Sequence, residues 1–91
     1  MEIKRLGVVG AGIMGTGIAQ TAAAEGIPVL LKDVSKAVVT SSLAKLSAQL
    51  ERDVKKERLT AAQVKTIQAN ITPVENWEDL KSADFVVEAV A

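Results

Sequence analysis

Three residue types that carry much of enzyme chemistry are missing from this 91-residue chain: cysteine, histidine and tyrosine. Without cysteine, neither a disulfide nor thiolate chemistry is possible within these residues. Without histidine, no imidazole is available as a general base. No catalytic residue and no metal site are predicted. Aromatic residues are also rare, and the single Trp77 and the single Phe85 are expected to lie in the core.

Long apolar runs are missing as well. None approaches the roughly 20 residues of a membrane span. The N-terminus leads directly into a short strand pattern instead of the apolar segment of a signal peptide. We therefore expect a cytoplasmic protein without a membrane span, and no nucleic-acid partner is predicted. The content of 48% hydrophobic and 24% charged residues is ordinary for one globular domain.

The net charge of zero hides an uneven distribution. Residues 34–69 hold seven basic and three acidic side chains, whereas residues 70–91 hold one basic and five acidic side chains. Two solvated faces of opposite sign would explain this pattern. The alternative is that the basic segment meets an anionic ligand, and the sequence leaves both interpretations open.

Hydrophobic patterning predicts strands that alternate with helices. Strands are expected at 3–9, 29–33, 70–72 and 84–90, and helices from 13, at 35–57, at 60–69 and after 76. This alternation predicts an α/β fold with a doubly wound parallel sheet in the order 3-2-1-4. The helix at 35–57 is much longer than any strand. With the helix that follows, it should form a protruding pair between strands 2 and 3.

A glycine-rich turn, GAGIMG, connects the first strand to the first helix. In this pattern Gly10 makes the tight turn, Gly12 lets a pyrophosphate approach the backbone, and Gly15 lets helix and strand pack closely. The amides around Ile13 and Met14 point to the phosphates, where the helix dipole favours an anion. The motif predicts a Rossmann-type dinucleotide site; the alternative is a glycine-rich turn without a ligand.

An acidic residue, Asp33, follows Gly15 by eighteen positions, at the end of the second strand. A carboxylate there can accept both adenosine ribose hydroxyls and would repel a 2′-phosphate, which favours NAD over NADP. A helix-capping role is the alternative, and Lys32 and Lys36 leave room for NADP. Glu88 is interpreted as a structural residue, salt-bridged or at an exposed edge, with a catalytic carboxylate as the alternative.

Taken together, these motifs resemble the 3-hydroxyacyl-CoA dehydrogenases over essentially all 91 residues. The glycine turn continues as TGIAQ, the second strand ends in LKD, and residues 83–90 read ADFVVEAV. LKD looks more like the multifunctional β-oxidation proteins than the single-function enzymes. The resemblance implies oxidation of (3S)-3-hydroxyacyl-CoA to 3-ketoacyl-CoA in fatty acid β-oxidation, with hydride transfer to NAD⁺.

The resemblance also implies roles for particular residues. Met14 matches a cofactor contact in the glycine turn, and Asp33 matches the ribose-binding acid. Val90 and Ala91 match the loop beside the nicotinamide ribose. Lys56 aligns with a basic residue that contacts coenzyme A phosphates, so the implied substrate partner is an acyl-CoA.

The domain organisation implied by the resemblance is incomplete. The family's catalytic His–Glu pair and its helical C-terminal domain would lie after residue 91, so residues 1–91 are interpreted as the N-terminal part of an NAD-binding domain that is inactive alone. The full-length form is expected to be a homodimer or part of a multienzyme complex. Two alternatives stay open: a non-catalytic nucleotide-binding module, or another NAD(P)-dependent β-hydroxyacid dehydrogenase.

Overall fold

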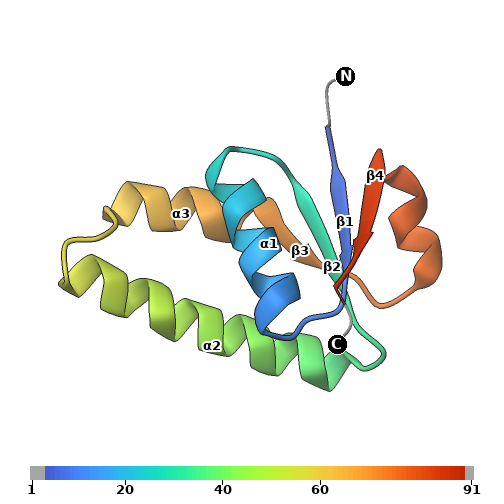
Figure 1. Cartoon of the computed structure of the whole chain (residues 1–91), viewed down its shortest axis with the longest axis horizontal. Coiled ribbons are helices and arrows are strands. Elements are labelled where there is room, and N and C mark those ends of the chain that lie inside the picture. The colour runs from blue at the N-terminus through green and yellow to red at the C-terminus, as the bar shows by residue number, and fades with distance from the viewer. Residues whose placement is uncertain (1–3, 90–91) are drawn as a thin grey trace.

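A computed structural model describes residues 4–89 of the chain, so Val90 and Ala91 of the predicted cofactor site lie outside the described residues. The described residues alternate between strands and helices (Figure 1). In chain order the elements are β1 (Leu6–Val9), α1 (Ile13–Ala24), β2 (Val29–Lys32), α2 (Lys36–Lys55), α3 (Ala61–Asn70), β3 (Ile71–Pro73), the 3-10 helix η1 (Trp77–Ser82) and β4 (Phe85–Glu88).

All four strands form one parallel sheet in the order β3-β2-β1-β4. Leu6 of β1 is paired with Val29 of β2 on one side and with Phe85 of β4 on the other. This order confirms the predicted α/β fold of the Rossmann type. Because the strands are parallel, their carboxyl ends meet at one edge of the sheet, where the glycine turn and Asp33 follow β1 and β2.

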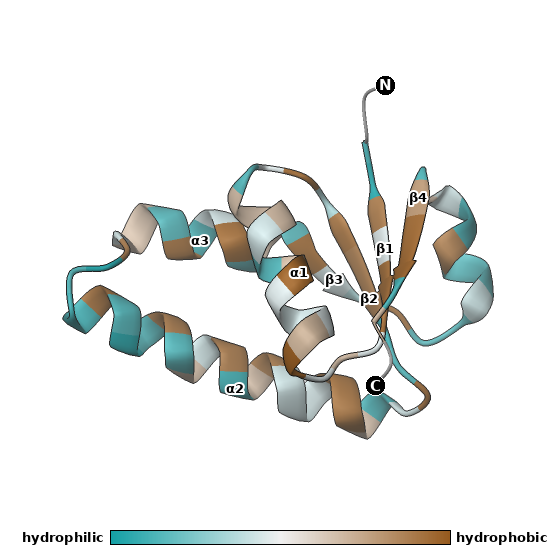
Figure 2. Ribbon diagram, viewed as in Figure 1, coloured by the Kyte–Doolittle hydropathy of each residue, from teal (hydrophilic) through white to brown (hydrophobic). Residues whose placement is uncertain are grey.

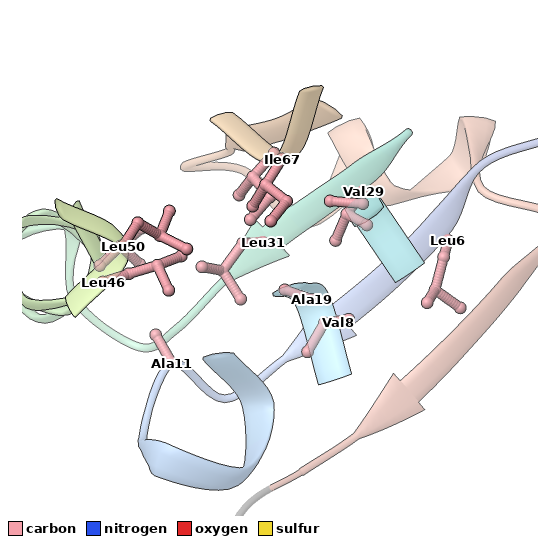
Figure 3. Packing of buried hydrophobic residues seen from close by; sticks show 12 residues of the cluster. Leu6, Val8, Ala11, Ala19, Val29, Leu31, Leu46, Leu50 and Ile67 are labelled. Carbon is pink, nitrogen blue, oxygen red and sulfur yellow. The ribbon is translucent and has the colours of Figure 1, made fainter. Parts of the chain in front are cut away.

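The hydrophobic core lies between the sheet and the helices α1 to α3 (Figure 3). Val8 and Leu31, at the centre of the sheet, are fully buried. Small side chains on α1, at Ala19 and Ala23, let that helix lie close against the strands. Figure 2 shows the hydrophobic residues gathered on the strands and a hydrophilic turn between α2 and α3.

The beginning of α1 is not part of the buried face of the helix. Met14 in the first turn is 66% exposed. The reason is geometric, because the first turn of α1 lies at the glycine turn, past the end of β1. The buried stripe therefore begins at Gly15 and continues through Ala19 and Ala23.

The helices α2 and α3 form the predicted protruding pair (Figure 1). The 20 residues of α2 give it a length of about 30 Å, whereas each strand has only three or four residues. Leu50 on α2 and Ile67 on α3 are buried in the common core cluster, which anchors the base of the pair. A capping box of Thr60 and Gln63 begins α3.

Two aromatic residues were wrongly predicted to lie in the core. Trp77 is 61% exposed at the start of η1, and Phe85 is 54% exposed on β4. Within residues 4–89, β4 is an edge strand that pairs only with β1. Glu88 is also exposed on β4, which agrees with its interpretation as an edge residue. No helix in this part of the chain is long and apolar enough to cross a membrane.

Candidate functional site

The glycine turn has the close approach that its sequence predicts. Gly10 has a φ of 111°, a conformation that side chains disfavour. A Cβ atom added to Gly15 would lie 1.7 Å from the carbonyl oxygen of Gly10, so no larger residue fits there. A Cβ added to Gly12 would meet no atom within 4 Å, which leaves open space over the backbone.

The N-terminus of α1 is open as well. Its N-cap residue, Gly12, makes no side-chain hydrogen bond, and the first turn contains no acidic residue. The first amides of any helix have no partner within the helix. At α1 they and the positive end of the helix dipole are therefore available to an anion.

Asp33 is bound directly to the glycine turn. Its Oδ2 accepts a hydrogen bond from the Ala11 amide at 2.6 Å, and its Oδ1 accepts one from the Val34 amide at 2.6 Å. Ala11 is itself fixed, because its side chain is buried in the core cluster beneath the turn (Figure 3). A carboxylate has about four lone-pair sites, so each oxygen keeps acceptor capacity for a further donor.

The helix-capping alternative for Asp33 is wrong. The N-cap residue of α2 is Ser35, whose hydroxyl accepts a hydrogen bond from the Val38 amide at 3.3 Å. The Asp33 carboxylate therefore has no capping function in α2.

A cavity of about 620 Å³ connects the glycine turn with Asp33. Five predicted site residues line it, whereas Gly15 lies behind them against Gly10. Sequence reasoning missed the apolar residues on its walls, although their positions at the carboxyl ends of strands were a usable signal. The lining consists of Val9, Gly10, Gly12, Ile13, Met14, Asp33, Val34 and Ala89.

The two lysines beside Asp33 both have partners within the protein. Lys32 is only 5% exposed, and its ammonium donates to the carbonyl oxygens of Asp33 and Glu75. Lys36 forms a 2.8 Å ion pair with the Glu75 carboxylate. The hydrogen bond between the two side chains, together with the attraction of their charges, raises the pKa of Lys36 and lowers the pKa of Glu75. Neither lysine lines the cavity, which weakens the NADP interpretation.

A second groove, of about 580 Å³, runs between α1 and α2. Lys45, Gln49 and Arg52 of α2 line it, opposite the first turns of α1. Lys56 is outside the lining, but it follows Arg52 by four residues and so lies one turn further along the same helical face. The sequence did not reveal this groove, and the anion contact of Lys56 stays a prediction.

Comparison with known proteins identifies the family to which this arrangement belongs. The family described as "3-hydroxyacyl-CoA dehydrogenase, NAD binding domain" matches residues 5–91. The chain belongs to this family. The resemblance inferred from the glycine turn, the acid after β2 and the β4 segment is therefore confirmed. The alternative of a separate β-hydroxyacid dehydrogenase family is not supported.

Individual members of the 3-hydroxyacyl-CoA dehydrogenase family align with the whole chain. A Bacillus subtilis protein described as a probable 3-hydroxybutyryl-CoA dehydrogenase is 43% identical over 91 residues, which is 100% of this chain and 32% of the relative. The crystal structure of (S)-3-hydroxybutyryl-CoA dehydrogenase from Ralstonia eutropha has a TM-score of 0.92 and 41% identity, covering 99% of this chain and 32% of that one.

A second solved member gives the same fold. The 3-hydroxybutyryl-CoA dehydrogenase from Escherichia coli superimposes with a TM-score of 0.95 at 34% identity, covering 100% of this chain and 19% of that one. The chain therefore spans about a third or less of the length of the relatives that it matches. What it has in common with them is the NAD-binding part of the family.

Proposed function

We propose that the cavity between the glycine turn and Asp33 binds NAD. The observation that carries the proposal is the junction of two complementary groups in one cavity. One is the open N-terminus of α1, and the other is a carboxylate fixed to the same turn by the 2.6 Å bond from Ala11. The chain is then the N-terminal part of the cofactor domain of a 3-hydroxyacyl-CoA dehydrogenase.

The residues present fit a dinucleotide. The space over Gly12 accommodates the pyrophosphate, which the α1 amides neutralise. The free lone pairs of Asp33 accept the adenosine ribose hydroxyls, and its charge repels a 2′-phosphate. Val34, which is 89% exposed beside this carboxylate, offers an apolar wall for the adenine ring. Bound NAD⁺ supplies the hydride acceptor, and Val90 and Ala91 are proposed to lie beside the nicotinamide ribose.

The proposed reaction is oxidation of (3S)-3-hydroxyacyl-CoA to 3-ketoacyl-CoA, as in fatty acid β-oxidation. Hydride removal must be accompanied by transfer of the hydroxyl proton to a base. The 91 residues contain no histidine, so the family's catalytic His–Glu pair is not among them. We therefore assign cofactor binding to this chain and proton transfer to a part of the enzyme outside these 91 residues.

The coenzyme A part of the substrate is proposed to contact Lys56. Positions 45, 49, 52 and 56 follow a spacing of three or four residues, which places them on one face of α2. Three of these residues are basic, and they continue from the groove next to the glycine turn towards the tip of the helix. Basic residues also favour the C-terminus of a helix for dipole reasons alone, so a binding test is needed.

The cofactor proposal is tested by titrating NAD and NADP into the chain in a calorimeter. We expect NAD to bind more tightly than NADP. With a 3-hydroxyacyl-CoA added, we expect no formation of NADH, because the chain contains no histidine to act as the base. Absence of NAD binding would contradict the proposed site, and turnover by these 91 residues would contradict the assignment of the chemistry.

The role of Lys56 is tested with coenzyme A at low ionic strength, where exposed charges are least screened. Lys56→Glu should weaken coenzyme A binding several-fold and leave NAD binding unchanged. Lys81→Glu, an equal charge reversal on η1, is the matched control. Equal losses in the two variants would show general electrostatic attraction instead of a site at Lys56.

A further inference from the structure

Lys32 is the one charged residue whose side chain is buried among residues 4–89. Its ammonium donates to the carbonyl oxygen of Asp33 at 3.2 Å and to that of Glu75 at 2.9 Å. It also lies 4.6 Å from the centroid of the Trp77 ring, a cation–π distance. A buried ammonium is costly unless its donors are satisfied, and here its direct partners are two carbonyl groups and one aromatic ring, with the Glu75 carboxylate close enough for a Coulombic interaction.

Because of the position of Lys32 in the chain, these contacts also hold the neighbouring residue, Asp33. Lys32 is the last residue of β2, and Asp33 is the next residue. The main chain of Asp33 is held by the Lys32 ammonium, while its carboxylate is held by the Ala11 and Val34 amides. Asp33 is thus fixed at both ends, by the β3–η1 segment on one side and by the glycine turn on the other.

The structure assigns Lys32 as a positioning residue for the ribose-binding carboxylate of Asp33, with Glu75 and Trp77 as its anchor. This inference rests on the proposed function, because it concerns the same NAD site. A carboxylate that already accepts two amide hydrogen bonds has only part of its lone pairs left for ribose hydroxyls. A small rotation of the Asp33 peptide would misalign these lone pairs, so fixing that peptide lowers the cost of binding.

Lys36 supplies a matched control on the same segment. Its ammonium also contacts Glu75, but at the carboxylate, and both side chains are largely exposed. An exposed ion pair contributes little to stability. Lys36→Met therefore removes the same charge from the same neighbourhood without touching the Asp33 peptide.

The test compares NAD affinity in Lys32→Met, Lys32→Arg and Lys36→Met, each made in the wild-type chain and in an Asp33→Asn background. Lys32→Met should raise the Kd for NAD roughly tenfold, the loss expected for one or two bonds made by a charged group. Lys32→Arg, which can still donate to both carbonyls, should recover most of the affinity. Lys36→Met should change the Kd by less than about twofold.

The Asp33→Asn background decides whether Lys32 acts through Asp33. If it does, the tenfold effect of Lys32→Met should largely disappear there, because interacting positions are not additive. Trp77 is the only tryptophan, so its fluorescence reports the ring contact. Lys32→Met should shift the emission, and Lys36→Met should not.

The proposal is overturned if folded Lys32→Met binds NAD as the wild type does, or if its effect is the same in both backgrounds. Should Lys32→Met fail to fold, Trp77→Leu keeps both carbonyl bonds and removes only the ring. It should raise the Kd about threefold in the wild type and not in Asp33→Asn, and an unchanged Kd overturns the proposal. A wild-type chain that binds no NAD overturns the proposed function itself. This outcome is distinct from failure of the Lys32 proposal, because it is seen before any substitution is made.

Discussion

The helices α1, α2 and α3 differ in whether a side chain caps the free amides at their N-termini. At α2 the Ser35 hydroxyl accepts a hydrogen bond from Val38, and at α3 Thr60 and Gln63 satisfy each other's amides. At α1 the N-cap is Gly12, which has no side chain to offer. All three helices lie in one small domain, yet only α1 begins without a side-chain cap among them.

Under the proposed function, this difference distinguishes the N-terminus of α1, which binds a ligand, from those of α2 and α3, which are structural. Capping satisfies the free amides at the start of a helix and stabilises it by about 1 kcal/mol. Leaving α1 uncapped forgoes that stability and keeps the amides available to a phosphate. In the proposed NAD site, the glycine residues that prevent capping also leave room for the ligand, so one local sequence serves both purposes.

The largest effect is expected at Gly15. Gly15→Ala places a methyl group against the carbonyl oxygen of Gly10, which cannot move without disrupting the turn. We expect a loss of about 3 kcal/mol or more in the free energy of unfolding, together with loss of NAD binding. Gly17→Ala is the control, because nothing lies within 4 Å of its added Cβ. It should stabilise α1 by about 0.5–1 kcal/mol, and equal melting temperatures for the two variants would contradict the packing argument.

The next largest effect is expected at Asp33. Asp33→Ala should raise the Kd for NAD by roughly ten- to several-hundred-fold, because one or two charge-assisted bonds are lost. NADP should lose little, since the charge that repels its 2′-phosphate is also removed. Asp79→Ala, which removes the capping carboxylate of η1, is the control and should reduce stability alone. A constant ratio of the two cofactor affinities in calorimetry would contradict the ribose assignment.

A smaller change should move stability and affinity in opposite directions. Ile13 is 97% exposed in the first turn of α1, so Ile13→Glu adds a carboxylate where the helix dipole favours one. Stability should rise by about 0.3–1 kcal/mol, whereas NAD should bind several-fold more weakly because the carboxylate competes with the pyrophosphate. Ile13→Gln separates charge from shape. If melting temperature and affinity fall together, the first turn of α1 does not hold an anion.

The smallest effect on the cofactor is expected at the other end of the molecule. Thr60→Ala removes the capping box of α3 and should cost about 1 kcal/mol of stability. Its NAD affinity should equal that of the wild type, because α3 does not line the cavity. A weakened NAD affinity in folded Thr60→Ala would show that the helical pair and the cofactor site are coupled.

Local chemistry explains what the sequence could predict. The starts of α2 and α3 follow from Ser35 and from the Thr60 capping box, because a cap is decided by neighbours in the chain. The glycine turn is equally local, since only glycine tolerates the backbone of Gly10 and the contact at Gly15. The parallel sheet then follows from the alternation of strands and helices, and its order is the one typical of a dinucleotide-binding fold.

Tertiary contacts explain what the sequence could not predict. The hydrogen bond from Ala11 to Asp33 and the burial of Lys32 depend on contacts between three loops. The hydrophobic periodicity of the sequence does not predict such contacts. Hydrophobicity alone placed Trp77 and Phe85 in the core, but the ring of Trp77 instead lies over the Lys32 ammonium with much of its surface exposed. The basic groove beside α2 likewise appears only when α1 is packed against it.

The two ends of α2 should differ in the rate of amide hydrogen exchange, because only part of this long helix is anchored in the core. Val39, Leu46 and Leu50 are buried at its base, whereas no buried residue follows Leu50 in the helix. Amide hydrogens near Val39 should therefore exchange with solvent only when the whole domain unfolds, and those from residue 51 onwards should exchange by local fraying. We therefore expect the tip of α2 to open without disturbing the cavity between the glycine turn and Asp33 at the other end of the helix.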